Sequence, residues 1–413
     1  MSGIMIPDVR KSVSRRREAD YPFALLRTNP IRHSIMHKQL LLMATLFWSI
    51  PSFSQQTSPG RGDHGFVIKI NKNVELLGFV YFLGYEGGQS ETAGYSSRTK
   101  ARYAYGLDVY KQYKSHAGSK HLAVAIGFAQ NIWLDYFLNL LVQLDEFPHA
   151  KLDNDIALAY YRRFSPKGDS TEARANASAF IDAMNGLYRE VDFELYMQQN
   201  ACKYENAKSQ VTAGLPDSRF VPAMESFYQG HLDSYNLLPS LMIPAGMGFG
   251  VKYKAGEKTH AFHIFGSFAP PVYHVDSQLN MGFDNKKHLL ELSTHEFGHS
   301  FVNSAIDRLP AEMITATESL YEPISQAMSD QAYTTWKSCL YEHFVRAGEI
   351  VIAQNLGNMA DAMALKEHYI ANRKFIYLPE LLKELESYNA SKNGSYMQAV
   401  ERAMERLREK TSK

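Results

Sequence analysis

The sequence contains little cysteine and almost no net charge. Its two cysteines among 413 residues, Cys202 and Cys339, belong to no C-x-x-C pair, which excludes a structural zinc ribbon. An oxidising compartment would permit a disulfide between them, and two buried free thiols fit the sequence equally well. The 44 basic and 43 acidic residues leave a formal charge of +1. Nucleic-acid-binding proteins need a strong basic excess, so no nucleic-acid partner is predicted.

Long hydrophobic runs are also missing. The apolar segment Leu40–Ile50 has 11 residues, too few to cross a bilayer. It follows the basic start Met36-His37-Lys38 and precedes the small-residue site Ser52-Phe53-Ser54. Residues 36–55 therefore have the three parts of a secretory signal, with cleavage expected after residue 54. We predict a secreted or periplasmic protein with no stable membrane span once the signal peptide is removed.

The rest of the chain divides into parts of different character. Residues 1–35 lack the pattern of a folded segment: either translation starts at Met36, or they form a cytoplasmic extension before an uncleaved anchor. Residues 56–65 are polar and are predicted to be a disordered linker. The sequence is 45% hydrophobic and 21% charged, as expected for a globular protein with a sizeable core. It shows no internal repeat and no low-complexity segment.

Helical periodicity dominates the first part of the folded region, and strand periodicity follows it. We predict a helical N-terminal lobe over 66–235, with helices that include 154–164 and 171–204. Strands are predicted at 237–244, 248–253 and 260–268, inside a second lobe that covers 236–413.

One stretch of the second lobe contains a complete H-E-x-x-H motif, with His295, Glu296 and His299. Residues four apart lie on one face of a helix, so the two histidines can bind the same zinc ion. Glu296 then lies beside the open coordination position, where a general base takes a proton from the attacking water. Apolar residues at helical spacings over 286–306 predict a buried helix. The alternative is a buried helix whose histidines only form hydrogen bonds.

A catalytic zinc needs a third protein ligand, and the sequence leaves several candidates. Glu342 is favoured, because it occupies the middle of a strong predicted helix over 333–354, where Arg346 lies one turn further on and can orient the carboxylate. An ordinary surface pair between Glu342 and Arg346 is the alternative. Pro323 fits the first turn of a helix, which makes the preceding residue, Glu322, a helix cap. The other candidates are Glu318, Glu322, Cys339 and His343.

Two further sets of residues complete the candidate site. A donor for the oxyanion is required, and His343, Tyr341 and Arg346 can each supply one. His288 lies on the same helix face as His295, but the helical rise puts it roughly 10 Å away, so it is not a ligand. The histidines on the predicted strands and after them receive no role: His260, His263 and His274.

These residues also resemble a known family. Three stretches are similar to a secreted bacterial H-E-x-x-H family, the 4932 family of domains of unknown function. They are residues 295–303, the step Tyr321-Glu322-Pro323 and residues 341–347. The resemblance covers most of residues 66–405. Ser304 departs from it where proline is expected, which changes the helix exit and not the chemistry. The resemblance implies a zincin-like peptidase and no established substrate.

We therefore predict an α+β protein: a mostly helical, zincin-like metallopeptidase fold with a small mixed sheet next to the H-E-x-x-H helix. His295, His299 and Glu342 would bind Zn²⁺, with Glu296 as the general base. A peptide or protein substrate would pair with an edge strand. One alternative is a secreted peptide- or glycan-binding protein without turnover, with or without zinc. Another is a helical protein with a fortuitous motif. The intact Glu296 counts against a purely structural zinc site.

Overall fold

The computed structural model describes residues 65–92, 94–271 and 280–411. The predicted signal peptide, the extension before it, almost all of the linker and His274 lie outside these residues. Within them, both cysteines are free thiols, Cys202 exposed and Cys339 buried. None of the helices in these ranges combines the length and the apolar character needed to cross a membrane.

A small sheet forms the centre of the described chain. Its strands are β1 (Phe66–Ile68), β2 (Ser234–Pro239), β3 (Gly248–Ala255) and β4 (Lys258–Phe265), in the order β1-β2-β4-β3. The β1–β2 and β2–β4 pairs are parallel, and the β3–β4 hairpin is antiparallel. The predicted α+β class, mostly helical with a small mixed sheet, is confirmed.

Helices make up most of the remaining structure. They are α1 (Lys72–Tyr81), α2 (Gly87–Ser90), α3 (Ser97–Arg102), α4 (Ala104–Tyr113), α5 (Lys120–Ala129), α6 (Leu134–Leu141), α7 (Ser170–Glu190), α8 (Phe193–Gln199), α9 (Ala201–Ala213), α10 (Phe220–Tyr228), α11 (Lys286–Asp307), α12 (Ala311–Thr315), α13 (Ser325–Ser329), α14 (Trp336–Asn355), α15 (Met359–Glu367), α16 (Leu378–Ser391) and α17 (Tyr396–Thr411).

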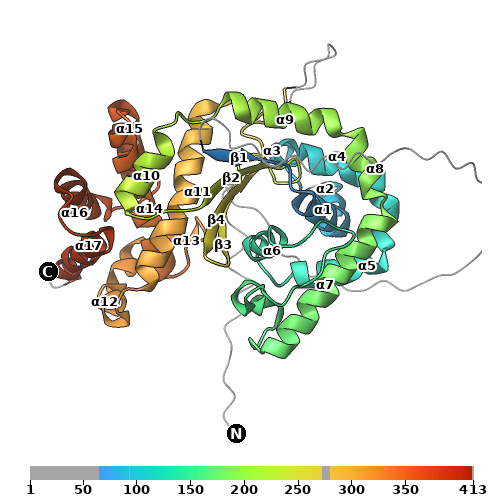
Figure 1. Ribbon diagram of the computed structural model, residues 1–413, viewed down its shortest axis with the longest axis horizontal. Coiled ribbons are helices and arrows are strands. Elements are labelled where there is room, and N and C mark those ends of the chain that lie inside the picture. The colour runs from blue at the N-terminus through green and yellow to red at the C-terminus, as the bar shows by residue number, and fades with distance from the viewer. Residues whose placement is uncertain (1–64, 93, 272–279, 412–413) are drawn as a thin grey trace, which may run out of the picture.

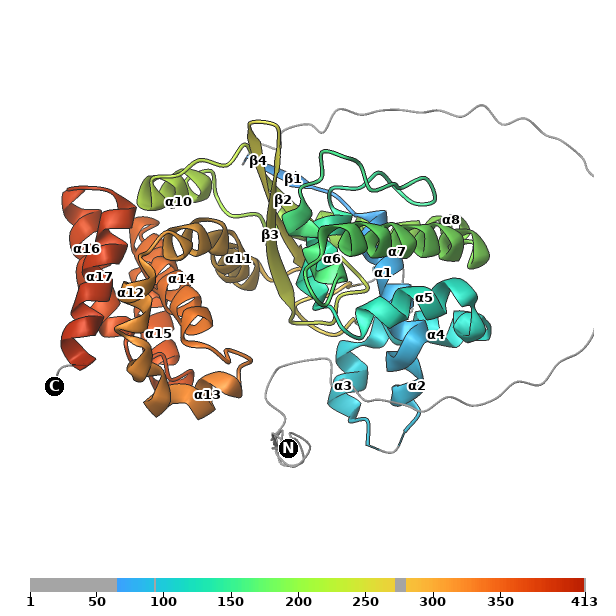
Figure 2. The same cartoon turned by 90° about the horizontal axis from the view of Figure 1, so that it is seen from below.

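The sheet lies between two groups of helices. Figure 2 shows α1 and α4 to α7 on one side of it, and α11, α14, α16 and α17 on the other. Helix α6 packs against β3 from the first side, and α11 packs against β3 and β4 from the second. Figure 1 shows α11 running alongside the strands. The predicted lobe boundary at residue 235 falls inside β2, so the sheet combines strands from both predicted lobes.

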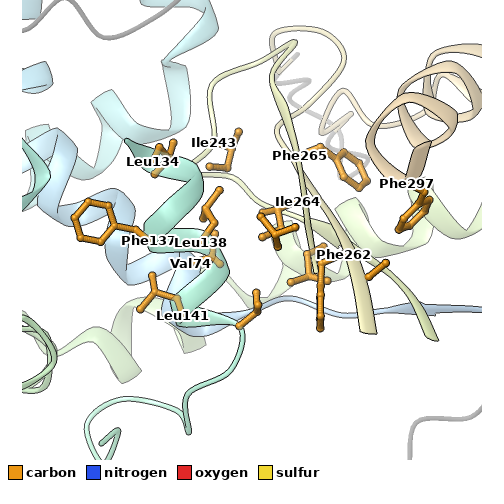
Figure 3. Close-up of a cluster of buried hydrophobic side chains, with 14 of the residues drawn as sticks. Val74, Leu134, Phe137, Leu138, Leu141, Ile243, Phe262, Ile264, Phe265 and Phe297 are labelled. Atoms are coloured by element: carbon orange, nitrogen blue, oxygen red, sulfur yellow. The ribbon is translucent and has the colours of Figure 1, made fainter. Parts of the chain in front are cut away.

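The core is built on the alternation of side chains along β4. Ile264 points toward Leu134 and Leu138 of α6, whereas Phe265 lies on the side of α11 (Figure 3). Phe297, inside the H-E-x-x-H motif, is fully buried on that second side, where its ring stacks on Phe66 of β1 with centroids 6.2 Å apart. The motif helix is thus anchored to the sheet by aromatic packing.

Three predicted elements differ from the structure. The strand predicted at 237–244 ends at Pro239, because the Ser240 hydroxyl accepts hydrogen bonds from the amides of Met242 and Ile243 and turns the chain. The helix predicted at 171–204 is instead three helices, α7, α8 and α9. The break between α7 and α8 contains Asp192, which adopts a left-handed φ of 48°. The α-helix predicted at 154–164 is wrong: this segment contains only short 3₁₀ turns.

Candidate metal centre

Helix α11 places the two motif histidines on one face. It begins at Lys286, where the Asn285 side chain accepts a hydrogen bond from the amide of His288. His295 and His299 follow one turn apart, and their Nε2 atoms are separated by 3.3 Å. Both imidazoles direct Nε2 toward the same point, so they can bind a single ion.

Helix α14 brings Glu342 to that point. Its Oε1 lies 3.3 Å from Nε2 of His299, and its Oε2 lies 3.7 Å from Nε2 of His295. The three residues form a group whose ligand atoms all lie within 4.8 Å of one another. Glu342 was the favoured third ligand from the sequence. Glu318 and Glu322 are exposed on a separate 3₁₀ segment, Glu318–Ile324, outside this group.

The spacing of the three donors fits a tetrahedral cation. Zinc–nitrogen and zinc–oxygen bonds of roughly 2.0–2.1 Å at tetrahedral angles put two donors about 3.3 Å apart. The separations from His299 to the other two side chains have this value, and Nε2 of His295 lies somewhat further, 3.7 Å, from Oε2 of Glu342. A His₂Glu donor set also matches the nitrogen and oxygen ligands that zinc prefers at catalytic sites.

Each of the three side chains is held by a further polar partner. His295 donates from Nδ1 to Oε1 of Glu349 over 2.6 Å, and His299 donates from Nδ1 to Oδ1 of Asn303 over 3.1 Å. Both Nε2 atoms are therefore left as acceptors for a metal. Glu342 accepts a 2.9 Å hydrogen bond from Nη2 of Arg346. Such partners fix ring orientation and tautomer at metal sites.

Arg346 provides the balancing positive charge. It is 5% exposed, and its guanidinium lies 4.7 Å from the ring centres of both Tyr369 and Phe375. Besides Glu342 it faces Glu349, at 3.9 Å, and Glu349 also accepts a hydrogen bond from the Tyr369 hydroxyl. Arg346 thus sits in an aromatic clamp between two buried carboxylates.

The charges of the cluster act strongly on one another. Burial opposes ionisation of Glu342, but His295, His299 and Arg346 hold the pKa of its carboxyl well below the usual range. Burial also disfavours a charged His299, yet the carboxylates of Glu342 and Glu296 raise the pKa of this histidine to about 9. A binding metal must displace that proton, because only the neutral imidazole is a ligand.

Glu296 lies against the edge strand of the sheet. The carboxyl group is almost fully buried, which raises its pKa, and it accepts a hydrogen bond from the backbone amide of Gly250 on β3. A side chain at Gly250 would overlap the carbonyl oxygen of Glu296, so this approach requires glycine. The G-x-G sequence at Gly248 and Gly250 therefore lets α11 pack closely on β3.

A comparison with protein families decides the affiliation of the chain. The family described as Domain of unknown function (DUF4932) matches residues 66–402. The chain belongs to this family. The DUF4932 match contains every residue of the candidate metal centre. Searches of curated proteins and of solved structures found no match.

Two of the three predicted oxyanion donors in the DUF4932 domain have contacts that lead away from the cluster. His343 donates from Nδ1 to the carbonyl of Cys339 over 2.8 Å, and its ring packs on Phe375. The Tyr341 hydroxyl donates to Asp307 over 2.5 Å. Of the three oxyanion candidates, only Arg346 contacts a residue of the metal cluster.

Sequence reasoning missed Asn303, Glu349 and Tyr369. Asn303 follows His299 by four residues, and Glu349 follows Glu342 by seven, so each lies on the same helix face as the ligand before it. That spacing was a usable signal for both. Tyr369 comes from a separate π-helical turn, and its approach to Glu349 depends on how α14 and α15 pack.

Proposed function

We propose that this protein is a secreted zinc metallopeptidase that hydrolyses peptide bonds. The observation that carries the proposal is the convergence of His295, His299 and Glu342, each oriented by its own polar partner. Glu296, the residue after the first histidine, projects a buried carboxylate beside this group. A purely structural site would have four protein ligands and no need of an additional carboxylate beside them.

The chemistry is divided between the ion and the chain. A zinc ion held by these three residues would polarise the scissile carbonyl and lower the pKa of its bound water, so that a good nucleophile is available near neutral pH. Glu296 takes the proton from the attacking water and later delivers it to the leaving amine. Its raised pKa suits both steps, because a strongly acidic carboxyl would be a poor acceptor.

The edge strand supports a peptide as the substrate. The amide of Gly266 donates to the carbonyl of Met247 over 3.0 Å, so the odd-numbered residues of β3 pair with β4. The backbone groups of Gly248, Gly250 and Lys252 consequently face the outer edge of the sheet. The Gly250 amide is already bonded to Glu296, and the remaining backbone groups of this edge can bind an extended peptide as a further strand beside that carboxylate.

The alternative function is a peptide- or glycan-binding protein that holds zinc without turnover. The intact Glu296, held beside the ligands, favours the peptidase. Secretion follows from the predicted signal peptide alone, and it remains a prediction.

Metal content and cleavage separate these functions. We would purify the chain from Gln56 as wild type, His295→Ala and Glu296→Gln, add zinc, and measure zinc per chain and cleavage of a peptide library. The peptidase predicts about one zinc in wild type and Glu296→Gln, less in His295→Ala, and cleavage by wild type only. Zinc without cleavage would support the binding protein, and a wild type without zinc would overturn both zinc functions.

A further inference from the structure

His263 lies beneath the motif helix without a role in the metal cluster. It is on β4, fully buried, on the strand face that points to α11. Its Nδ1 lies 3.1 Å from the hydroxyl of Ser293, which is also fully buried and lies two residues before His295. The ring packs against Phe265 with centroids 4.3 Å apart. His263 is therefore held in one orientation.

The other ring nitrogen of His263 has no partner among the described residues. Nε2 is buried and forms no hydrogen bond, which is unfavourable for a polar atom. It borders the small space that the missing side chain of Gly248 leaves open. The point that a Cβ of Gly248 would occupy lies 3.1 Å from this Nε2 and 3.3 Å from Oε1 of Glu296. Both atoms therefore border the same small space beside Gly248, and a water molecule at that point would lie within hydrogen-bond distance of each.

We propose that His263 is a positioning residue for Glu296: its Nε2–H is directed at Oε1 through one water molecule in the space beside Gly248. In this arrangement the Ser293 hydroxyl is the donor to Nδ1, which keeps the proton on Nε2. Oε2 of Glu296 lies on the other side, toward the Gly250 amide. Two donors, one for each oxygen, fix the plane of the carboxylate.

The chemistry of the pocket agrees with a neutral donor. Burial lowers the pKa of His263 well below its usual value, so the ring is uncharged. A neutral imidazole can orient Glu296 without the strong attraction that would turn the carboxylate into a poor base. The proposal rests on the proposed function in one respect, the role of Glu296 as the base.

Nuclear magnetic resonance of the metal-free protein tests the contact itself. With ¹⁵N-labelled histidine, the proton on Nε2 of His263 gives a signal that is assigned by its loss in His263→Gln. We expect this signal to move in Glu296→Gln and to stay in place in Glu291→Gln, a matched change on the same helix. A proton found on Nδ1, or a signal at the same position in wild type and Glu296→Gln, would overturn the proposal.

Turnover and zinc content test the consequence. In His263→Leu we expect wild-type zinc content and a kcat lower by about tenfold or more, the range seen when partners of metal-site groups are removed. His263→Gln keeps an N–H donor and should restore most of kcat. Equal kcat in wild type and His263→Leu would overturn the positioning role. If the wild type cleaves no peptide, the proposed function fails, and the resonance comparison still decides the contact.

Discussion

His295 donates a hydrogen bond from Nδ1 to Oε1 of Glu349, a residue 54 positions later, over 2.6 Å. Glu349 in turn accepts from the hydroxyl of Tyr369. This chain of side chains joins α11 to α14 and to the segment after α15. It fixes the imidazole with Nε2 free to bind a metal.

Replacing Glu349 by glutamine should weaken zinc binding without removing a ligand. The amide cannot hold the His295 ring as firmly, so we expect zinc affinity to fall by about 10- to 100-fold. Competition with a chromophoric chelator measures this. Glu386→Gln is the control, because Glu386 bonds only to Gln354 among the described residues. Unchanged affinity in Glu349→Gln would show that Glu349 does not orient the ligand.

Removing the charge of Arg346 should destabilise the metal-free protein. Arg346→Met leaves Glu342 and Glu349 buried without their cation, which costs about 3–5 kcal/mol of unfolding free energy. Arg402→Met removes a half-exposed partner of Glu384 and should cost less than about 1 kcal/mol. Urea unfolding of both variants gives the comparison. Similar losses would mean that Arg346 is not the balancing charge.

Glycine lets α14 approach Tyr228 of α10, which also packs on α11. A Cβ added at Gly348 of α14 would overlap the hydroxyl of Tyr228, whose ring stacks on Phe301 of α11 with centroids 4.8 Å apart. Gly348→Ala should therefore push α14 outward, cost about 1–3 kcal/mol and reduce zinc affinity. Gly127→Ala, on an exposed face of α5 with open space around it, should gain up to about 1 kcal/mol. Thermal unfolding and zinc titration would detect the difference. Equal stability and equal zinc affinity in the two variants would show that Gly348 is not needed for the approach of α14 to Tyr228.

A buried carboxyl in the N-terminal part should make stability depend on pH. Burial raises the pKa of Glu75 from 4.5 to about 7, although Tyr204 donates a 2.8 Å hydrogen bond to it. The folded state keeps this proton while the unfolded state releases it, so stability falls as pH rises. We expect wild type to lose about 3 kcal/mol relative to Glu75→Gln between pH 4.5 and 7.

Denaturant unfolding at several pH values measures that difference. Glu205→Gln is a suitable control, because Glu205 is an exposed residue paired with Lys208 on the surface of α9. It should follow the wild-type pH profile. Parallel profiles for wild type and Glu75→Gln would show that Glu75 ionises normally.

The sequence was most informative where chemistry and local geometry coincide. The spacing of His295 and His299 defines one helix face, and the burial pattern around Glu342 required a partner for its charge. Both arguments use contacts within one helix turn. Glu349 lay within reach of the same argument, since it shares the face of Glu342, but the sequence offered several acidic residues and no way to rank them.

The rest depends on contacts between distant segments. No local pattern specifies that β1 pairs with β2, or that Tyr369 reaches Glu349. The break at Asp192 was missed because the flanking sequence has uninterrupted helical periodicity, while tertiary packing holds one residue in a left-handed conformation. His263 was left without a role for a similar reason, since the gap beside Gly248 exists only in the assembled sheet.

The stacking of Phe66 on Phe297 has a consequence for folding kinetics. The first strand and the motif helix meet only after most of the chain is available, and Glu342 joins them from still further along. Such long-range contacts give a high contact order, which slows folding because long loops must close before the contacts form. A nascent chain that ends before α14 has the histidines without the glutamate. The donor set is therefore completed only once α14 is available.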